Sequence, residues 1–175
     1  MEIREIKSLG NNYWGFVGEK NDWDVCKIEE EKFEFLFNVK KTRDIKLLGE
    51  GCVAIQNTNS IWRVLKKDQD GELKEQLKSM NVREIKSLGN NYWGFVDKDN
   101  NWKVYKIEEE KFKFLFRTIN TKDIKLLGEG YTAIKDTNST WSVWKKDQFG
   151  KWKEQLKSME IREIKSLGNN YWGFV

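Results

Sequence analysis

The sequence predicts an all-β chain built from repeated four-stranded units, and its internal repetition is the main reason. Residues 159–175 repeat residues 1–17 letter for letter, and residues 81–96 are a near copy, which sets a period of 79 residues. Within that period, the pattern Ile-Lys-x-Leu-Gly recurs five times and Trp-x-Val-x-Lys four times, at spacings of 39 or 40 residues. Periods of this length are typical of solenoids, propellers and arrays, in which one unit cannot bury its apolar face alone.

Each repeat of about 40 residues is expected to hold four strands. In the clearest repeat, residues 82–88 alternate apolar and polar side chains, and residues 92–96 form a short apolar run. A second alternation over residues 102–108 and a phenylalanine-rich segment, 111–117, complete the unit. Turn-forming residues separate these runs, so four strands of five to seven residues are predicted. The segment 72–80 is interpreted as an outer strand, although its good helix formers leave a helical turn as an alternative.

The repeats divide the chain into four complete units and the beginning of a fifth, all within a single repeat domain, 1–175. The predicted units are 3–41, 42–81, 82–120, 121–160 and the partial unit 161–175.

Four antiparallel strands in about 40 residues, repeated four times or more, are the layout of a β-propeller blade. One tryptophan recurs in the third strand of every complete unit, and its large apolar area is expected to form the core of the repeat. These structural positions are Trp23, Trp62, Trp102 and Trp141.

The chain therefore resembles, over its full length, a β-propeller of the broad WD-repeat or tachylectin-like kind. The likeness lies in spacing and pattern, because the Gly-His and Trp-Asp dipeptides of WD repeats do not recur. It implies an architecture and no particular activity. Two small Src-homology-3-like barrels in tandem are an alternative, and a β-trefoil is another, although a trefoil needs three units.

The partial unit predicts self-association. Residues 159–175 supply only the first two strands of a blade, and these are identical to strands at the start of the chain. Unpaired strand edges and exposed aromatic residues favour aggregation, so we expect an oligomer with strands exchanged through this segment. Docking on another chain and the cut end of a longer array are the alternatives.

Composition argues against catalysis. Histidine is absent, which removes the commonest general base and metal ligand. The run 29–31 of three glutamates is interpreted as a solvated strand end, and the acidic turn 97–100 lacks the ligand spacing of a calcium loop. Catalysis usually needs one asymmetric set of residues, whereas this chain offers the same residues several times. We therefore expect no enzyme activity, no cofactor and no metal.

Charge, hydropathy and cysteine content limit the binding partners and the cysteine chemistry that we expect. Lys and Glu are interspersed and the net charge is only +4, so no nucleic-acid partner is expected. No apolar run is long enough for a membrane span and no signal peptide is visible, which predicts a soluble, by default cytoplasmic, protein without a membrane partner. Cys26 and Cys52 are replaced by Tyr105 and Tyr131 one period later, which favours thiols over a structural disulfide.

Repetition favours multivalent, non-enzymatic binding, because several copies of one weak site give avidity. A lectin-like carbohydrate binder is the first hypothesis, with the repeated Gly-Asn-Asn-Tyr loop as the candidate site. The stronger interpretation of this loop is a tight turn of left-handed Asn residues beside a core aromatic. A protein-interaction or assembly scaffold is the alternative, as is an engineered or duplicated repeat propeller without a dedicated ligand. The candidate ligand-binding residues are Asn11, Asn12, Tyr13, Asn90, Asn91, Tyr92, Asn169, Asn170 and Tyr171.

Overall fold

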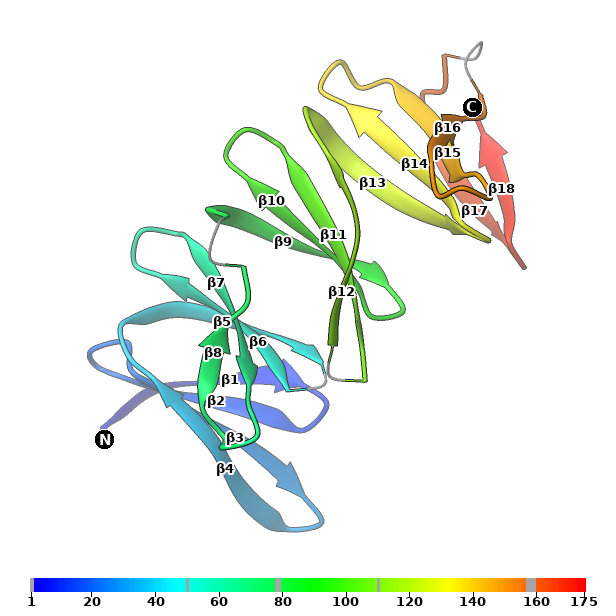
Figure 1. Ribbon diagram of the computed structural model, residues 1–175. Helices are drawn as coiled ribbons and strands as arrows, with labels where there is room; N and C mark the ends of the chain where they lie inside the picture. Colours follow the sequence, from blue (N-terminus) through cyan, green and yellow to red (C-terminus); the bar gives the residue numbers. More distant parts are fainter. Residues whose placement is uncertain (1, 50, 78–79, 110, 157–159) are drawn as a thin grey trace. The chain divides into compact units, whose positions relative to one another are not determined.

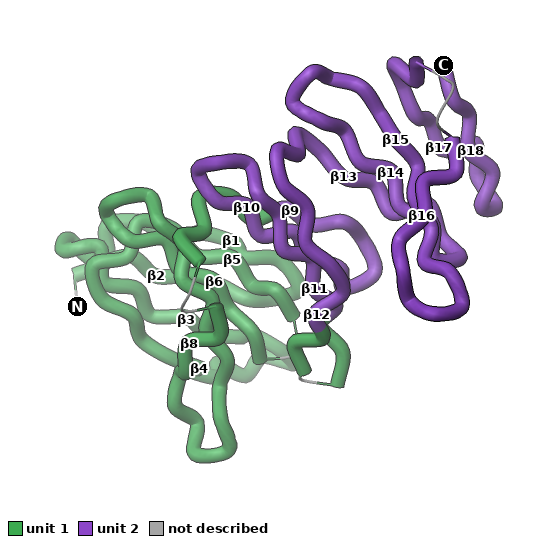
Figure 2. The backbone as a smooth tube through the Cα atoms, turned by 45° about the horizontal axis from the view of Figure 1, so that its top comes forward, with its two compact units in different colours: residues 1–85, 107–113 green, residues 86–106, 114–175 purple. Residues whose placement is uncertain are grey.

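The structure, a computed structural model, describes residues 2–49, 51–77, 80–109, 111–156 and 160–175 (Figure 1). Eighteen β-strands make up the regular structure of these residues. They form two compact units, each considered by itself below (Figure 2). Unit 1 comprises residues 1–85 and 107–113, and unit 2 comprises residues 86–106 and 114–175.

The strands follow the predicted repeat closely, and we call each set of four a blade. Blade 1 contains β1 (Ile3–Gly10), β2 (Tyr13–Gly18), β3 (Trp23–Glu29) and β4 (Lys32–Val39). Blade 2 contains β5 (Thr42–Gly49), β6 (Cys52–Asn57), β7 (Trp62–Lys67) and β8 (Leu73–Glu75). Blade 3 contains β9 (Val82–Gly89), β10 (Tyr92–Asp97), β11 (Trp102–Glu108) and β12 (Lys111–Thr118). Blade 4 contains β13 (Thr121–Gly128), β14 (Tyr131–Asp136), β15 (Trp141–Lys146) and β16 (Trp152–Glu154). A two-stranded sheet of β17 (Ile164–Gly168) and β18 (Tyr171–Phe174) follows.

Each blade is an antiparallel meander, in which consecutive strands are hydrogen-bonded neighbours. The predicted all-β fold of four-stranded propeller blades, with the first strands of a fifth, is confirmed. The segment 72–80 begins with the outer strand β8, which is only three residues long, and Lys78 and Ser79 lie outside the described residues. Within the described ranges there is no helix of the length and apolarity that crossing a membrane would require.

In unit 1 the core lies between blades 1 and 2. Trp23 and Val25 of β3 pack with Ile45 and Val53 of blade 2 in one cluster of buried side chains. The indole Nε1 of Trp23 donates a hydrogen bond of 2.8 Å to the carbonyl oxygen of Thr42, at the start of blade 2. The Trp23 side chain therefore fills the apolar space between the two blades and is hydrogen-bonded to the first residue of blade 2.

Unit 2 repeats this arrangement one period later. Trp102 is buried with Val104, Phe116 and Ile124, and its Nε1 donates a 2.7 Å hydrogen bond to the carbonyl oxygen of Thr121. A second cluster joins blade 4 to the last two strands, where Ile161 and Ile164 are buried with Trp141. Because those two isoleucines belong to the core of unit 2, the partial repeat is packed within its own unit.

The structure explains why the two sequence motifs occur together. The lysine of Ile-Lys-x-Leu-Gly lies over the indole ring of the Trp-x-Val-x-Lys tryptophan in all four blades, at 5.1–5.4 Å from the ring centroid. Each tryptophan is at most 5% exposed. The cation–π contact holds the lysine ammonium group over the buried ring. The methylene stem of the same lysine covers apolar surface. These pairs are Lys7–Trp23, Lys46–Trp62, Lys86–Trp102 and Lys125–Trp141.

A small residue opposite each of these lysines makes room for the indole. Gly15 pairs with Lys7 across the sheet, and a Cβ atom on Gly15 would come within 2.7 Å of the Trp23 ring. Gly94 stands at the corresponding place against Trp102, at 2.6 Å. Such a contact is closer than van der Waals packing permits, so the second strand of blades 1 and 3 requires glycine.

Candidate functional site

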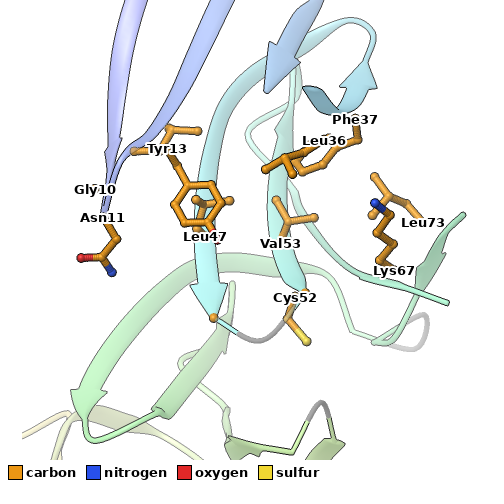
Figure 3. A pocket seen from close by; sticks show the side chains of 13 residues that line it. Gly10, Asn11, Tyr13, Leu36, Phe37, Leu47, Cys52, Val53, Lys67 and Leu73 are labelled. Atoms are coloured by element: carbon orange, nitrogen blue, oxygen red, sulfur yellow. The ribbon is translucent and has the colours of Figure 1, made fainter. Parts of the chain in front are cut away.

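Pockets recur at the same place in the repeat, beside the turn that joins the first two strands of a blade. The unit 1 pocket has a volume of about 240 Å³ and lies between blades 1 and 2 (Figure 3). The unit 2 pocket, about 390 Å³, is lined by the corresponding residues 79 positions later. The C-terminal pocket, about 520 Å³, lies in unit 2 between blade 4 and the sheet of β17 and β18. The pocket therefore belongs to the repeat and not to one unusual loop.

In the unit 1 pocket, one wall comes from the β1–β2 turn and the other from blade 2. Asn11 and Tyr13 come from the turn, Leu36 from β4, and Val53 and Leu73 from blade 2 (Figure 3). Lys67 at the end of β7 contributes an ammonium group to this largely apolar lining. An apolar floor with few polar groups at its rim is the usual composition of a ligand pocket.

The unit 2 pocket keeps this plan and is more aromatic. Tyr92 stands where Tyr13 does, while Tyr131 and Trp152 replace Cys52 and Leu73. The Trp152 ring meets Phe116 edge to face, with 5.0 Å between the ring centroids. Such aromatic pairs fix the orientation of both rings and present a rigid surface to a ligand.

Lysines accompany the tyrosines of these pockets. The β-sheet register places Lys27 opposite Tyr13 and Lys106 opposite Tyr92, and their Nζ atoms lie 5.9 and 5.6 Å from the ring centroids. Lys145 lies closest, 4.1 Å from the ring of Tyr131. The last lysine of Trp-x-Val-x-Lys is therefore positioned by the ladder itself to bring positive charge to a tyrosine of the pocket.

Electrostatic contacts keep one of these lysines charged. Lys27 forms an ion pair with Glu29, and this hydrogen bond raises the pKa of Lys27 above its ordinary value. In the core of blade 1, burial and the nearby carboxylate of Asp24 raise the pKa of the Cys26 thiol. A raised thiol pKa keeps that cysteine protonated and unreactive at neutral pH.

The paired asparagines have a conformational role. Asn11 has φ 47° and Asn12 has φ 64°, and they connect the paired residues Gly10 and Tyr13. Positive φ at both central positions defines a type I′ turn, for which Asn is among the most favourable residues. The corresponding asparagines of the other two copies have φ of 45° and 62°. The turn chemistry thus accounts for the Asn-Asn pair whether or not a ligand binds.

The structure brings six of the nine predicted ligand-binding residues to pocket walls. They are Asn11, Tyr13, Asn90, Tyr92, Asn170 and Tyr171. The other three belong to the same turns but do not line these three pockets: Asn12, Asn91 and Asn169. Ligand binding by the nine residues stays a prediction.

Sequence reasoning did not find the opposite wall of each pocket. Lys67 and Leu73 in unit 1, and Lys146 and Trp152 in unit 2, come from the following blade, more than 50 residues along the chain. One signal was present in the sequence: three of the wall positions differ between the two periods. These differences are Cys52/Tyr131, Val53/Thr132 and Leu73/Trp152.

No group of His, Cys, Asp and Glu suited to a metal ion occurs among the residues that the structure describes. Cys26 and Cys52 are buried thiols.

Comparisons with known proteins add similarity in structure only. No protein-family model matches the chain, and no curated protein sequence does. Among solved structures, the chain is similar to the N-terminal domain of Nup159, with 10% identity and a TM-score of 0.48 over 85% of this chain and 42% of that one.

Two further solved structures show the same level of similarity. A Saccharomyces cerevisiae complex of Dbp5 with Nup159, Gle1, IP6 and ADP gives 11% identity and a TM-score of 0.47, covering 85% of this chain and 41% of the other. A Lactobacillus plantarum protein gives 13% identity and a TM-score of 0.44, covering 86% and 54%. The chain thus spans about two fifths to one half of the length of these proteins.

Proposed function

We propose that the protein is a non-enzymatic, multivalent binding module whose repeated pockets bind carbohydrate. The observation that carries this proposal is the recurrence of the pocket at corresponding places of the repeat. In the unit 1 and unit 2 pockets Asn and Tyr come from the first-blade turn, whereas in the C-terminal pocket Asn170 and Tyr171 lie on the opposite wall. Several weak, similar sites on one chain favour a ligand that is itself repetitive, because simultaneous engagement multiplies the affinity of each site.

The residue types support a sugar ligand. Tyrosine rings offer apolar faces for the C–H groups of a pyranose, and the amide of Asn and the ammonium of Lys can hydrogen-bond its hydroxyl groups. Tyr92 and Asn90 combine both functions on one turn, with Lys146 contributed by the opposite wall. Volumes of about 240 to 520 Å³ lie around the lower end of the range usual for pockets that bind small molecules.

A glycan-array screen of the purified chain, followed by titration of the best ligands, tests the proposal. Tyr92→Ala should weaken binding at least tenfold, because it removes the ring face and leaves the turn intact. Phe149→Ala is the matched control, since Phe149 is an aromatic residue 78% exposed in a turn outside the three pockets. Silence across the array, or equal binding by both variants, would contradict carbohydrate binding at these pockets.

A protein-interaction scaffold is the second candidate, favoured by an exposed apolar surface on blade 1. Ile28, Phe33 and Phe35 of β3 and β4 are 39%, 60% and 57% exposed. Exposed aromatic side chains of this kind are enriched in protein interfaces. If the double variant Phe33→Ser/Phe35→Ser leaves the sedimentation behaviour and the solubility of the chain unchanged, this surface has no self-binding role.

Self-association through residues 159–175 stays a proposal of its own. Within unit 2, Ile161 and Ile164 are 2% and 1% exposed, whereas Leu167 and Tyr171 are 69% and 71% exposed. Deleting the segment would open a core, so the informative variant is Leu167→Ser on its exposed face. Light scattering should show an oligomer for the parent chain and a smaller species for the variant. A monomeric parent chain would end this proposal.

A further inference from the structure

The unit 2 pocket and the C-terminal pocket, which both lie in unit 2, adjoin each other. Gly128, Glu129 and Tyr131, from the turn between β13 and β14, line both the unit 2 pocket and the C-terminal pocket. One hairpin tip is therefore the shared wall of two hollows of about 390 and 520 Å³. A ligand longer than one pocket can continue over Tyr131 into the next.

A row of tyrosines follows this path. Tyr92, Tyr131 and Tyr171 each begin the second strand of successive sheets, β10, β14 and β18. All three line the adjoining pockets, and Tyr171 is 71% exposed. Regularly repeated ring faces suit a ligand whose own flat units repeat, as the rings of an oligosaccharide do.

Positive charge accompanies the row. Lys145 lies over Tyr131 at 4.1 Å, Lys106 over Tyr92 at 5.6 Å, and Lys146 over Trp152 at 5.2 Å. Lys146 also donates a 3.1 Å hydrogen bond to the carbonyl oxygen of Leu115, which orders its ammonium group at the pocket. Of these three lysines only Lys146 lines a pocket, and its ammonium group can pair with an anionic substituent of a ring bound there. The carboxylate of Glu129 lines both pockets as well.

The sequence of the second period also has an excess of positive charge. Residues 80–158 contain 16 Lys and Arg against 11 Asp and Glu, while residues 1–79 contain 14 against 15. The second period is therefore positive and the first is close to neutral, although they share one scaffold. A positive surface raises the local concentration of anions and speeds their encounter with the site.

We propose that the adjoining pockets of unit 2 form one extended site for an acidic oligosaccharide of two or more residues. The inference rests on the proposed function and specifies its ligand class. Sugar rings lie on Tyr92, Tyr131 and Tyr171, and a carboxylate or sulfate group of the ligand pairs with Lys146, which lines the unit 2 pocket. In unit 1 the row is interrupted, because Cys52 stands in place of Tyr131 and Leu73 in place of Trp152.

Isothermal titration with galacturonic acid oligomers of one to six residues, and with a heparin-derived hexasaccharide, tests the site. Affinity should rise at least tenfold between one residue and three, with one chain binding one long oligomer. Methyl esters of the same galacturonate oligomers keep the rings and remove the charge, and they should bind at least tenfold more weakly.

The chain supplies its own matched variants. Tyr131→Cys and Trp152→Leu install residues that unit 1 already carries at the corresponding places, so these variants preserve the fold of a blade. Each should lower the affinity for the long oligomer at least tenfold, with an unchanged thermal midpoint as the folding control. Lys146→Gln should weaken acidic oligomers and leave their methyl esters unaffected.

The outcomes separate this inference from the broader proposal. Neutral sugars bound through Tyr92, with no preference for the acidic oligomers, would overturn the inference and leave carbohydrate binding in place. No binding by any glycan would overturn both. Tighter binding of an oligothymidylate than of any acidic oligosaccharide would assign the site to single-stranded nucleic acid and overturn the inference.

Discussion

The unit 1 and unit 2 pockets are the same construction at two places, 79 residues apart, and they differ in what they present to a ligand. Their shared parts are the Asn-Asn turn, the tyrosine that follows it and the lysine at the end of the third blade strand. Their differences are concentrated on one wall, where a thiol, a valine and a leucine in unit 1 become tyrosine, threonine and tryptophan in unit 2. The comparison teaches that the repeat fixes the site, while a few wall positions can change its chemistry.

Corresponding substitutions in the buried scaffold should lower the unfolding free energy equally in both units. This is the largest effect that we expect. Gly15→Ala and Gly94→Ala each press a Cβ atom into an indole ring and should cost about 1–3 kcal/mol of unfolding free energy. Chemical denaturation of the two variants measures it. Ala133 occupies the corresponding position of blade 4, so Ala133→Gly is the control, with a smaller loss from backbone entropy.

Equal losses for the two glycine variants would show that the scaffolds are energetically equivalent. If only one of the two variants loses unfolding free energy, the comparison fails. The two units would then differ in the buried packing beneath the pockets as well as in the pocket walls.

Exchanging the walls should exchange the binding behaviour. The triple variant Cys52→Tyr/Val53→Thr/Leu73→Trp gives the unit 1 pocket the lining of the unit 2 pocket, and we expect this single pocket to gain affinity for a short acidic oligosaccharide. A tenfold gain at that pocket corresponds to about 1.4 kcal/mol. Titration of this variant in a Tyr131→Cys background isolates the new site, and an unchanged binding curve would show that the wall residues do not decide specificity.

The lysine–tryptophan contacts are expected to contribute less. Lys7→Met in unit 1 and Lys86→Met in unit 2 keep the apolar stem and remove the ammonium over the indole, at 5.2 and 5.1 Å. Each should lower stability by about 0.5–1 kcal/mol, measured by urea unfolding. Stability that is unchanged in both variants would mean that the stems alone account for the recurrence of this lysine.

Acid should weaken two corresponding turns by a small amount. In unit 2, backbone N–H groups of Lys151 and Phe149 donate hydrogen bonds to the Asp147 carboxylate, which lowers its pKa below the ordinary 3.8. In unit 1, the Lys74 side chain and the backbone N–H of Glu72 lower the pKa of Asp68 in the same direction.

Because the pKa of each carboxyl group is lower in the folded state, its contribution is fully present above pH 3.8 and is lost as the pH falls through the folded value. Thermal midpoints measured between pH 6 and pH 2.5 should fall less steeply at the acid end for Asp147→Asn and for Asp68→Asn than for the parent chain. Identical profiles for parent and variants would remove these turns from the acid response.

The strands could be predicted because their signals are local. The expected strands 82–88 and 102–108 correspond to β9 and β11 within one residue, since alternation and turn residues mark their limits. Of the expected outer strand in 72–80, the structure has the three residues of β8, and Leu77 beyond it is buried. Helix formers and Leu spacing did not reveal that early departure from the sheet.

Only one wall of each pocket could be predicted from the sequence. The Asn-Asn-Tyr loop repeats visibly, which drew attention to the correct turn. The opposite wall comes from residues such as Leu73 that are about 60 positions away, and no periodicity indicates which of their faces meets the turn. The cross-strand register that brings Lys145 to Tyr131 likewise became visible only in the paired strands.

The sharing of a hairpin by adjoining pockets has an evolutionary consequence. Since each hollow uses the turn of one sheet and the wall of the next, duplicating a stretch of about 40 codons would create a new binding site together with the strands that enclose it. Recombination between near-identical gene segments could lengthen or shorten the row of sites in a single event. Point mutations at positions such as 52, 53 and 73 could then specialise each copy, so the lineage would adapt to longer or chemically different polymers without inventing a fold.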